Sequence, residues 1–204
     1  AVLVDVKPLD ITMTSRLLEQ IHISELKGLG AAMQSSTGGN PMFIIETIKH
    51  LIENKRLDIS PDKLPSVSKV SSLIQKRLEQ LSPPALRLAQ VAAVAGTDFD
   101  LDLAGQVLET HLLELAMPFS ELENKQVMRG QAFVHDLLFE TAIGSMPAPI
   151  KTLLALRIAR VLDKNGQRAK AAQHYLDSRS SWQESDTINA VASFTEVARS
   201  ISVT

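Results

Sequence analysis

The chain has 204 residues, a formal net charge of −2 and no cysteine. This length allows one or two domains with hydrophobic cores, and the lack of cysteine excludes disulfides and thiolate zinc sites. The nearly balanced charge gives no overall attraction to nucleic acid or to anionic membranes. No apolar run reaches membrane-spanning length, and the N-terminus lacks the basic start and cleavage region of a signal peptide. We therefore expect a cytoplasmic protein without a membrane partner.

Short elements are expected in the first 36 residues. Val2–Val6 alternates weakly between apolar and polar residues and predicts one short strand. Asp10 can cap a first short helix, and Ser24 can cap a second helix that continues to Met33. Because the chain starts without Met and directly in this strand-like run, we interpret it as a piece of a longer protein.

A glycine turn, Thr37-Gly38-Gly39-Asn40-Pro41, introduces a long apolar helix that runs to about Asn54. The two glycines allow a tight turn, Asn40 is a good N-cap, and Pro41 suits the first helical position. A glycine turn before a helix directs free N–H groups and the positive end of the helix dipole toward whatever lies there. That group is either a nucleotide or another part of the protein.

A helical region follows a linker. The stretch 57–65, with two prolines and charges of alternating sign, predicts the linker. A helix starts near Ser66, and Ser82-Pro83 caps and opens the next one, which ends at Gly96 with the glycine in a left-handed conformation. Asp100 can cap a short helix over Leu101–Leu108.

The pattern changes after residue 112. Helical spacing covers 112–123, where Pro118 either kinks the helix or divides it in two. Residues 127–135 predict a small β-hairpin, and Asp136 can cap a helix directly after it. Helices followed by a two-stranded wing are the layout of a winged helix.

Helices also dominate 147–204. Pro149 marks a helix start and Gly166 its end, and two more helices are expected around Tyr175 and over Ile188–Ile201. Small residues at close helical spacing are typical of helical repeats, so we expect the start of such a region. The predicted fold class is mainly α, with one small hairpin.

An ordered set of segments resembles the STAND-type signalling ATPases of the AAA+ class, which include the maltose-regulon activator, NB-ARC and NACHT proteins. Thr37–Glu46 resembles their Gly-x-Pro segment. Leu78–Pro83 and Val91–Gly96 resemble the start of the bacterial winged helix, and Phe133–Glu140 resembles the Met-His-Asp segment that ends it. Ala171–Tyr175 resembles the opening of the helical sensor repeats.

The resemblance implies a division of the chain and a nucleotide site. Residues 1–56 would be the end of an NTPase core and a helical lid, 57–65 a linker, 66–146 a winged-helix domain, and 147–204 the start of a TPR-like region. Pro41, in the turn with Gly39 and Asn40, would pack against adenine, and His135 would contact the β-phosphate of bound ADP. Val134 stands where the family has Met.

The motifs for ATP hydrolysis are missing from this sequence. It holds no G-x-x-x-x-G-K-[ST] loop, and no acidic residue ends a hydrophobic strand in a position to hold Mg²⁺. The resemblance therefore implies a regulatory fragment without enzyme activity, which shares ATP or ADP with an upstream nucleotide-binding core of the same protein. For the parent it implies a slow ATPase switch in signal transduction or transcription control, and it leaves a homo-oligomer open.

Two other functions remain open from the sequence. A winged helix can bind DNA, but the candidate recognition helix, Asp100–Leu108, holds two aspartates and no Lys or Arg, whereas phosphate contacts need cations. Alternatively, the chain is a structural scaffold in which Pro41 and His135 touch only protein. The histidines lack the spacing of zinc ligands.

Overall fold

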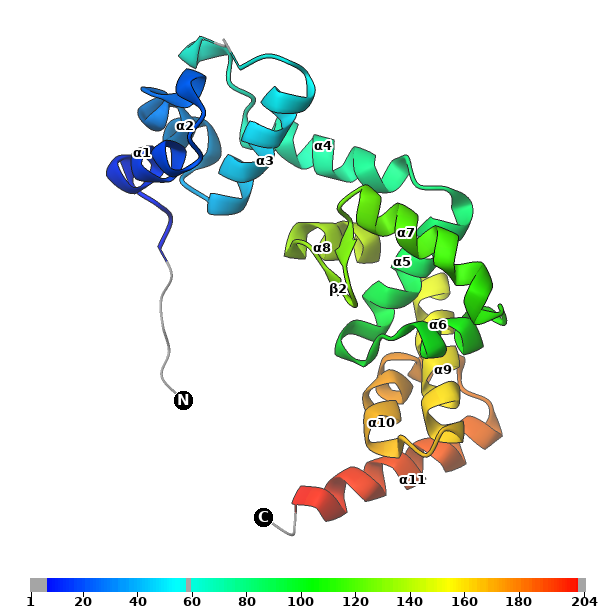
Figure 1. Cartoon of the computed structure of the whole chain (residues 1–204). Coiled ribbons are helices and arrows are strands. Elements are labelled where there is room, and N and C mark those ends of the chain that lie inside the picture. The colour runs from blue at the N-terminus through cyan, green and yellow to red at the C-terminus, as the bar shows by residue number, and fades with distance from the viewer. Residues whose placement is uncertain (1–6, 58–59, 202–204) are drawn as a thin grey trace. The chain divides into compact units, whose positions relative to one another are not determined.

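The structure, a computed structural model, describes residues 7–57 and 60–201 (Figure 1). As predicted, it is mainly α: in the described ranges, helices account for the regular structure except for one two-stranded sheet. The chain forms two compact units that divide between Ile74 and Gln75. The predicted strand Val2–Val6 lies outside the described residues. None of the helices described is both long and apolar enough to cross a membrane.

The first unit packs short helices around aliphatic side chains. Its elements are α1 (Ile11–Gln20), the 3₁₀ helix η1 (Ser24–Leu26), α2 (Gly30–Thr37), α3 (Pro41–Glu53), the 3₁₀ helix η2 (Pro61–Lys63) and the first part of α4 (Val67–Glu79). The buried core consists of Leu18, Leu26, Leu29, Met33, Ile44, Ile48 and Leu51. Side chains of this core come from both sides of the glycine turn, so the turn is fixed between α2 and α3.

The stretch predicted as a linker, 57–65, lies inside this unit. The 3₁₀ helix η2 lies inside the stretch 57–65, and Leu57 and Leu64 pack against the core of the first unit. The division between the two units lies further along the chain, inside α4. The four domain ranges given above stay predictions.

The helix predicted from Ser24 to Met33 is wrong. Ser24 begins a 3₁₀ helix of three residues, and its N-cap, Ile23, makes no side-chain cap bond. Gly28 follows with φ of 83° and α2 starts afresh at Gly30. The physical reason is that glycine enters the left-handed region at no steric cost, and this conformation ends the helix.

Four predicted helix caps are confirmed. Asp10 Oδ1 accepts the Met13 N–H at 2.7 Å, and Asp100 Oδ1 accepts the Leu103 N–H at 2.7 Å. The Asn40 and Ser82 side chains cap α3 and α5 (Pro83–Ala95), each with proline in the first helical position.

The second unit begins with helices and a hairpin in winged-helix order. The helices α5, α6 (Leu101–Leu108) and α7 (Ala116–Asn124) are followed by β1 (Met128–Arg129) and β2 (Ala132–Phe133), and the 3₁₀ helices η3 (Gly96–Asp98) and η4 (Leu112–Leu115) lie between the helices. The strands are antiparallel, with Met128 opposite Phe133. Gly130, with φ of 57°, makes the turn of this predicted hairpin. The helix α5 contacts α6, α7 and α8 (Asp136–Gly144), so it forms the centre of the unit.

The structure decides two predictions about the helices on either side of the wing. Pro118 marks a divided helix: η4 ends at Leu115 and α7 begins at Ala116, so proline takes the third position of α7, where its missing N–H breaks no helical bond. The predicted cap by Asp136 is wrong, because Asp136 is the first residue of α8 and His135 is the N-cap. A carboxylate in the first turn still suits the positive end of the helix dipole.

Three helices complete the second unit: α9 (Ala148–Lys164), α10 (Arg168–Asp177) and α11 (Glu184–Ile201), with the 3₁₀ helix η5 (Arg179–Ser181) before α11. The helix α10 packs against both α9 and α11 (Figure 1). Pro149 lies in the first turn of α9 and Gly166, with φ of 76°, follows its end, as predicted. The assignment of these helices to TPR-like repeats stays a prediction.

Candidate functional site

The turn between α2 and α3 depends on its two glycines. Gly38 and Gly39 have φ of 65° and 72°, a conformation that glycine adopts without steric cost. The Gly39 carbonyl accepts the Leu9 N–H at 2.8 Å, and a Cβ at Gly39 would clash with the Leu9 carbonyl oxygen. Gly39, predicted as a nucleotide-binding residue, therefore has a structural role, because it lets two backbone segments approach closely.

Asn40 and Pro41 form the start of α3, and both are exposed. Asn40 Oδ1 accepts the Met42 N–H at 2.9 Å, so this side chain serves as the helix cap. Pro41, in the first helical position, presents its ring to solvent. An exposed apolar ring beside a helix N-terminus can pack against a planar base. The adenine contact of Pro41 stays a prediction.

His135 lies in the second unit, between β2 and α8. Its backbone is extended, with φ of −146° and ψ of 146°, and its side chain is half-buried. It occupies the N-cap position, and its carbonyl accepts the Leu138 N–H at 3.0 Å, but its side chain does not cap the helix. His135 thus occupies the N-cap of a helix whose first N–H groups are donors that suit phosphate. The exposed carboxylate of Asp136 adds a negative charge at the same place.

The structure groups the predicted site residues in two places. Gly39, Asn40 and Pro41 share one turn of the first unit, and His135 belongs to the second unit. Their assembly into one nucleotide site stays a prediction. Within residues 7–57 and 60–201, no three His, Asp or Glu side chains gather in a way that could hold a metal ion.

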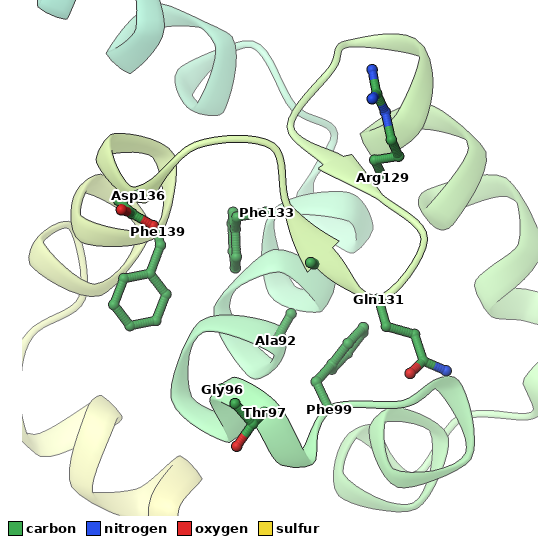
Figure 2. A pocket seen from close by; sticks show the side chains of 10 residues that line it. Ala92, Gly96, Thr97, Phe99, Arg129, Gln131, Phe133, Asp136 and Phe139 are labelled. Carbon is green, nitrogen blue, oxygen red and sulfur yellow. The ribbon is translucent and has the colours of Figure 1, made fainter. Parts of the chain in front are cut away.

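A hollow beside the wing is a site that the sequence did not reveal (Figure 2). We call it the wing pocket; it has a volume of about 600 Å³, and its walls include Ala92, Gly96, Phe99, Ala132, Phe133 and Phe139. The lining residues come from α5, η3, the hairpin and α8, all within the second unit. Three of the chain's six phenylalanines line it. Their gathering between residues 99 and 139 is the signal that could have pointed to it.

An ion pair between the exposed Arg160 side chain and the buried Asp186 carboxylate joins α9 to α11. Arg160 donates from Nε to Asp186 Oδ1 at 2.7 Å and from its terminal nitrogen to Oδ2 at 2.8 Å. These hydrogen bonds hold the pKa of the buried Asp186 carboxyl below its ordinary value and raise the pKa of Arg160. Asp186 Oδ2 also accepts the Gln183 N–H at 2.8 Å, which caps the start of α11. Both carboxylate oxygens of Asp186 accept hydrogen bonds, so we assign the pair a structural role in holding α11 against α9.

A second polar contact joins η3 to α10. The His174 ring, which is buried, lies with Nε2 at 3.2 Å from Asp98 Oδ2. Lys170 Nζ lies 3.6 Å from the other oxygen of the same carboxylate. Asp98, the last residue of η3, therefore faces two basic side chains of α10.

The last two α-helices before the wing, α6 and α7, do not favour DNA binding. In α6, Asp102 lies in the first turn, with Asp100 as its cap. In α7, which comes directly before the hairpin, Glu121 and Glu123 are the charged residues. Neither helix contains Lys or Arg, and DNA phosphates need cations for most of the binding energy.

Comparisons with known proteins add no assignment. A scan against protein-family models, a search of curated proteins and a search of solved structures each found no match. A function must therefore be argued from the residues and geometry described above.

Proposed function

We propose that this chain is the lid and winged-helix part of a STAND-type ATPase switch, located in the cytoplasm and without hydrolytic activity of its own. The observation that carries the proposal is the start of α8. His135 follows the wing closely and is the N-cap residue of α8, so the backbone places a histidine at a helix N-terminus. An imidazole and the N–H groups of a helix start are both donors that suit the β-phosphate of ADP.

The order of elements supports the same proposal. A glycine turn with an exposed proline at a helix start comes first, then three helices with a wing, then a helix that begins at the residue after His135. The expectation drawn from the STAND resemblance has these features in the same order. The helices α9 to α11 would then be the first part of a TPR-like region that receives the signal.

The proposed mechanism is a change between two nucleotide states. With ADP bound, Pro41 would cover the adenine ring and His135 would contact the β-phosphate, and an upstream core of the same protein would supply the remaining phosphate contacts and hold Mg²⁺. Exchange of ADP for ATP, together with a signal on the helical repeats, would move the winged helix outward and permit assembly of a homo-oligomer. A nucleotide can drive such a change only if it binds the two states with different affinity.

The test is nucleotide binding by the full-length parent protein, titrated with fluorescent ADP and ATP analogues. A hydrogen bond to a charged group contributes about 1.5–3 kcal/mol, so His135→Ala should weaken ADP binding about 10- to 100-fold and ATP binding less. Pro41→Ala should weaken both nucleotides alike, because both carry adenine. His111→Ala is the matched control: His111 is exposed, its ring accepts the Leu113 N–H at 3.3 Å, and the variant should bind ADP like the wild type.

The outcomes distinguish the proposed nucleotide switch from the role assigned to His135. If the parent protein binds neither nucleotide, the proposed function is wrong and a structural scaffold is the better account. If the parent binds ADP and His135→Ala binds it equally well, the function stands and the role of His135 is wrong.

A further inference from the structure

Aromatic rings from three separate elements converge on the wing pocket (Figure 2). Phe99 directly follows η3, Phe133 belongs to β2, and Phe139 belongs to α8. The rings of Phe133 and Phe139 meet edge to face, with centroids 6.0 Å apart and planes at 74°. Phe139 is 37% exposed, although the burial of a ring of this size is favourable. The pocket therefore offers aromatic surface that a ligand can cover.

Small residues keep the pocket open. Ala92 and Ala132 carry only a methyl group, and a Cβ built on Gly96 would meet no atom within 4 Å. The volume of about 600 Å³ lies within the range of about 300–1,000 Å³ that is usual for small-molecule sites. The space suits a compound of two or three fused rings.

The polar groups of the pocket carry no net charge. Thr97 and Gln131 supply a hydroxyl and an amide, and Arg129 and Asp136 are charges of opposite sign. Figure 2 shows the Arg129 side chain directed away from the aromatic rings. Aromatic walls with a few neutral polar groups at the border favour an uncharged, flat molecule with one or two hydrogen-bonding atoms.

We propose that the wing pocket binds an uncharged planar aromatic or heteroaromatic compound, packed against Phe133 and Phe139. The proposal does not depend on the nucleotide function, because no nucleotide takes part in it. A ligand of this class would bind beside β2 and the start of α8, where the lining residues Phe133 and Asp136 flank His135.

The experiment titrates 1-aminoanthracene, an uncharged planar dye that fluoresces more strongly in apolar surroundings, into the full 204-residue chain. We expect saturable binding of one dye per chain. Phe139→Ala should weaken binding about tenfold, because one aromatic wall is lost. Ala132→Trp should abolish binding, since the indole ring would occupy the space. Leu113→Ala is the control, because Leu113 is 77% exposed outside the pocket, and this variant should bind like the wild type.

A second measurement keeps the test valid if Ala132→Trp does not fold, as judged by circular dichroism. Amide resonances of the wild-type chain should then shift on addition of dye within residues 92–99 and 131–139. The proposal is overturned if binding does not saturate, if Phe139→Ala binds as tightly as the wild type, or if Leu113→Ala loses as much affinity as Phe139→Ala. It is also overturned if the shifts lie mainly outside those two ranges.

Discussion

Replacing Asp186 by Ala should destabilise the second unit by about 3 kcal/mol. The carboxylate accepts two hydrogen bonds from Arg160 and one from the Gln183 N–H. Breaking a fully buried ion pair costs about 3–5 kcal/mol. The Arg160 side chain is 43% exposed, so water can solvate the guanidinium once its partner is gone, and the ion-pair contribution falls to about 2 kcal/mol. Loss of the helix cap adds about 1 kcal/mol.

The effect of this substitution should depend on pH. Because Arg160 lowers the pKa of Asp186 in the folded state, the unfolded chain takes up a proton at this residue at a higher pH than the folded chain does. The stabilisation is fully present above the unfolded pKa of about 3.9 and declines as the pH falls through the folded pKa. The difference between wild type and variant should be complete at pH 7 and shrink below about pH 4.

Trp182 provides the assay. It is the chain's single tryptophan, its Nε1 donates to the Tyr175 carbonyl at 2.9 Å, and the two rings meet edge to face. Its fluorescence therefore reports the unfolding of α10 and α11. For Asp186→Ala we expect a drop in Tm of about 6–12 °C at pH 7.

Asp177→Ala is the matched control for that measurement. Asp177 is exposed and accepts one hydrogen bond, from Gln173 at 3.0 Å. Its replacement should change stability by less than about 0.5 kcal/mol. A loss of under about 1 kcal/mol for Asp186→Ala, or a loss that is the same at pH 7 and pH 3, would refute the reasoning from the ion pair.

Two further substitutions test contacts in the two units. Gly39→Ala should destabilise the first unit by about 2 kcal/mol or more in urea unfolding followed by circular dichroism, because φ is positive and the new Cβ would meet the Leu9 carbonyl oxygen. Glu121→Ala should cost the second unit about 1–2 kcal/mol in urea unfolding followed by Trp182 fluorescence, since Glu121 accepts the Ser82 N–H at 2.8 Å and the Ser82 hydroxyl at 2.5 Å. The Ser82 bonds lower the pKa of Glu121, so this loss should shrink as the pH falls below about 4.3.

Matched variants distinguish these effects from general damage. Gly38 also has positive φ, but a Cβ there would meet no atom within 4 Å, so Gly38→Ala should cost less than Gly39→Ala. Equal losses at the two glycines would contradict the close approach of Leu9. Glu114 lies exposed in η4, and a loss on Glu114→Ala as large as that of Glu121→Ala would contradict the assigned role of Ser82 and Glu121.

Local features of the fold were predictable from the sequence, and contacts over long range were not. The caps by Asp10, Asn40 and Asp100 each lie within four consecutive residues, so the sequence contains the whole interaction. The start of α5 shows the limit: the sequence predicts Ser82 as its cap, but the carboxylate that bonds the Ser82 N–H comes from Glu121, 39 residues away.

In the candidate sites, too, the sequence predicted the local features and missed the long-range contacts. The turn at Gly39 was visible as a turn, but its packing against the Leu9 backbone was not, because that contact depends on how α1 returns to α2. The wing pocket was missed because Phe99, Phe133 and Phe139 lie on three elements whose convergence only the fold creates. The periodic pattern of one helix or strand does not predict which side chains of other elements it will contact.

The three residues of η3 lie between the wing pocket and helix α10. Gly96 and Thr97 line the wing pocket, and the next residue, Asp98, faces His174 and Lys170 of α10. A ligand that displaces the backbone of η3 must also change the distance between Asp98 and α10. Coupling between two sites is reciprocal, so a partner that pulls α10 away from Asp98 would change the affinity of the pocket by the same factor. One turn of backbone would then relay a signal between the wing pocket and the last three helices.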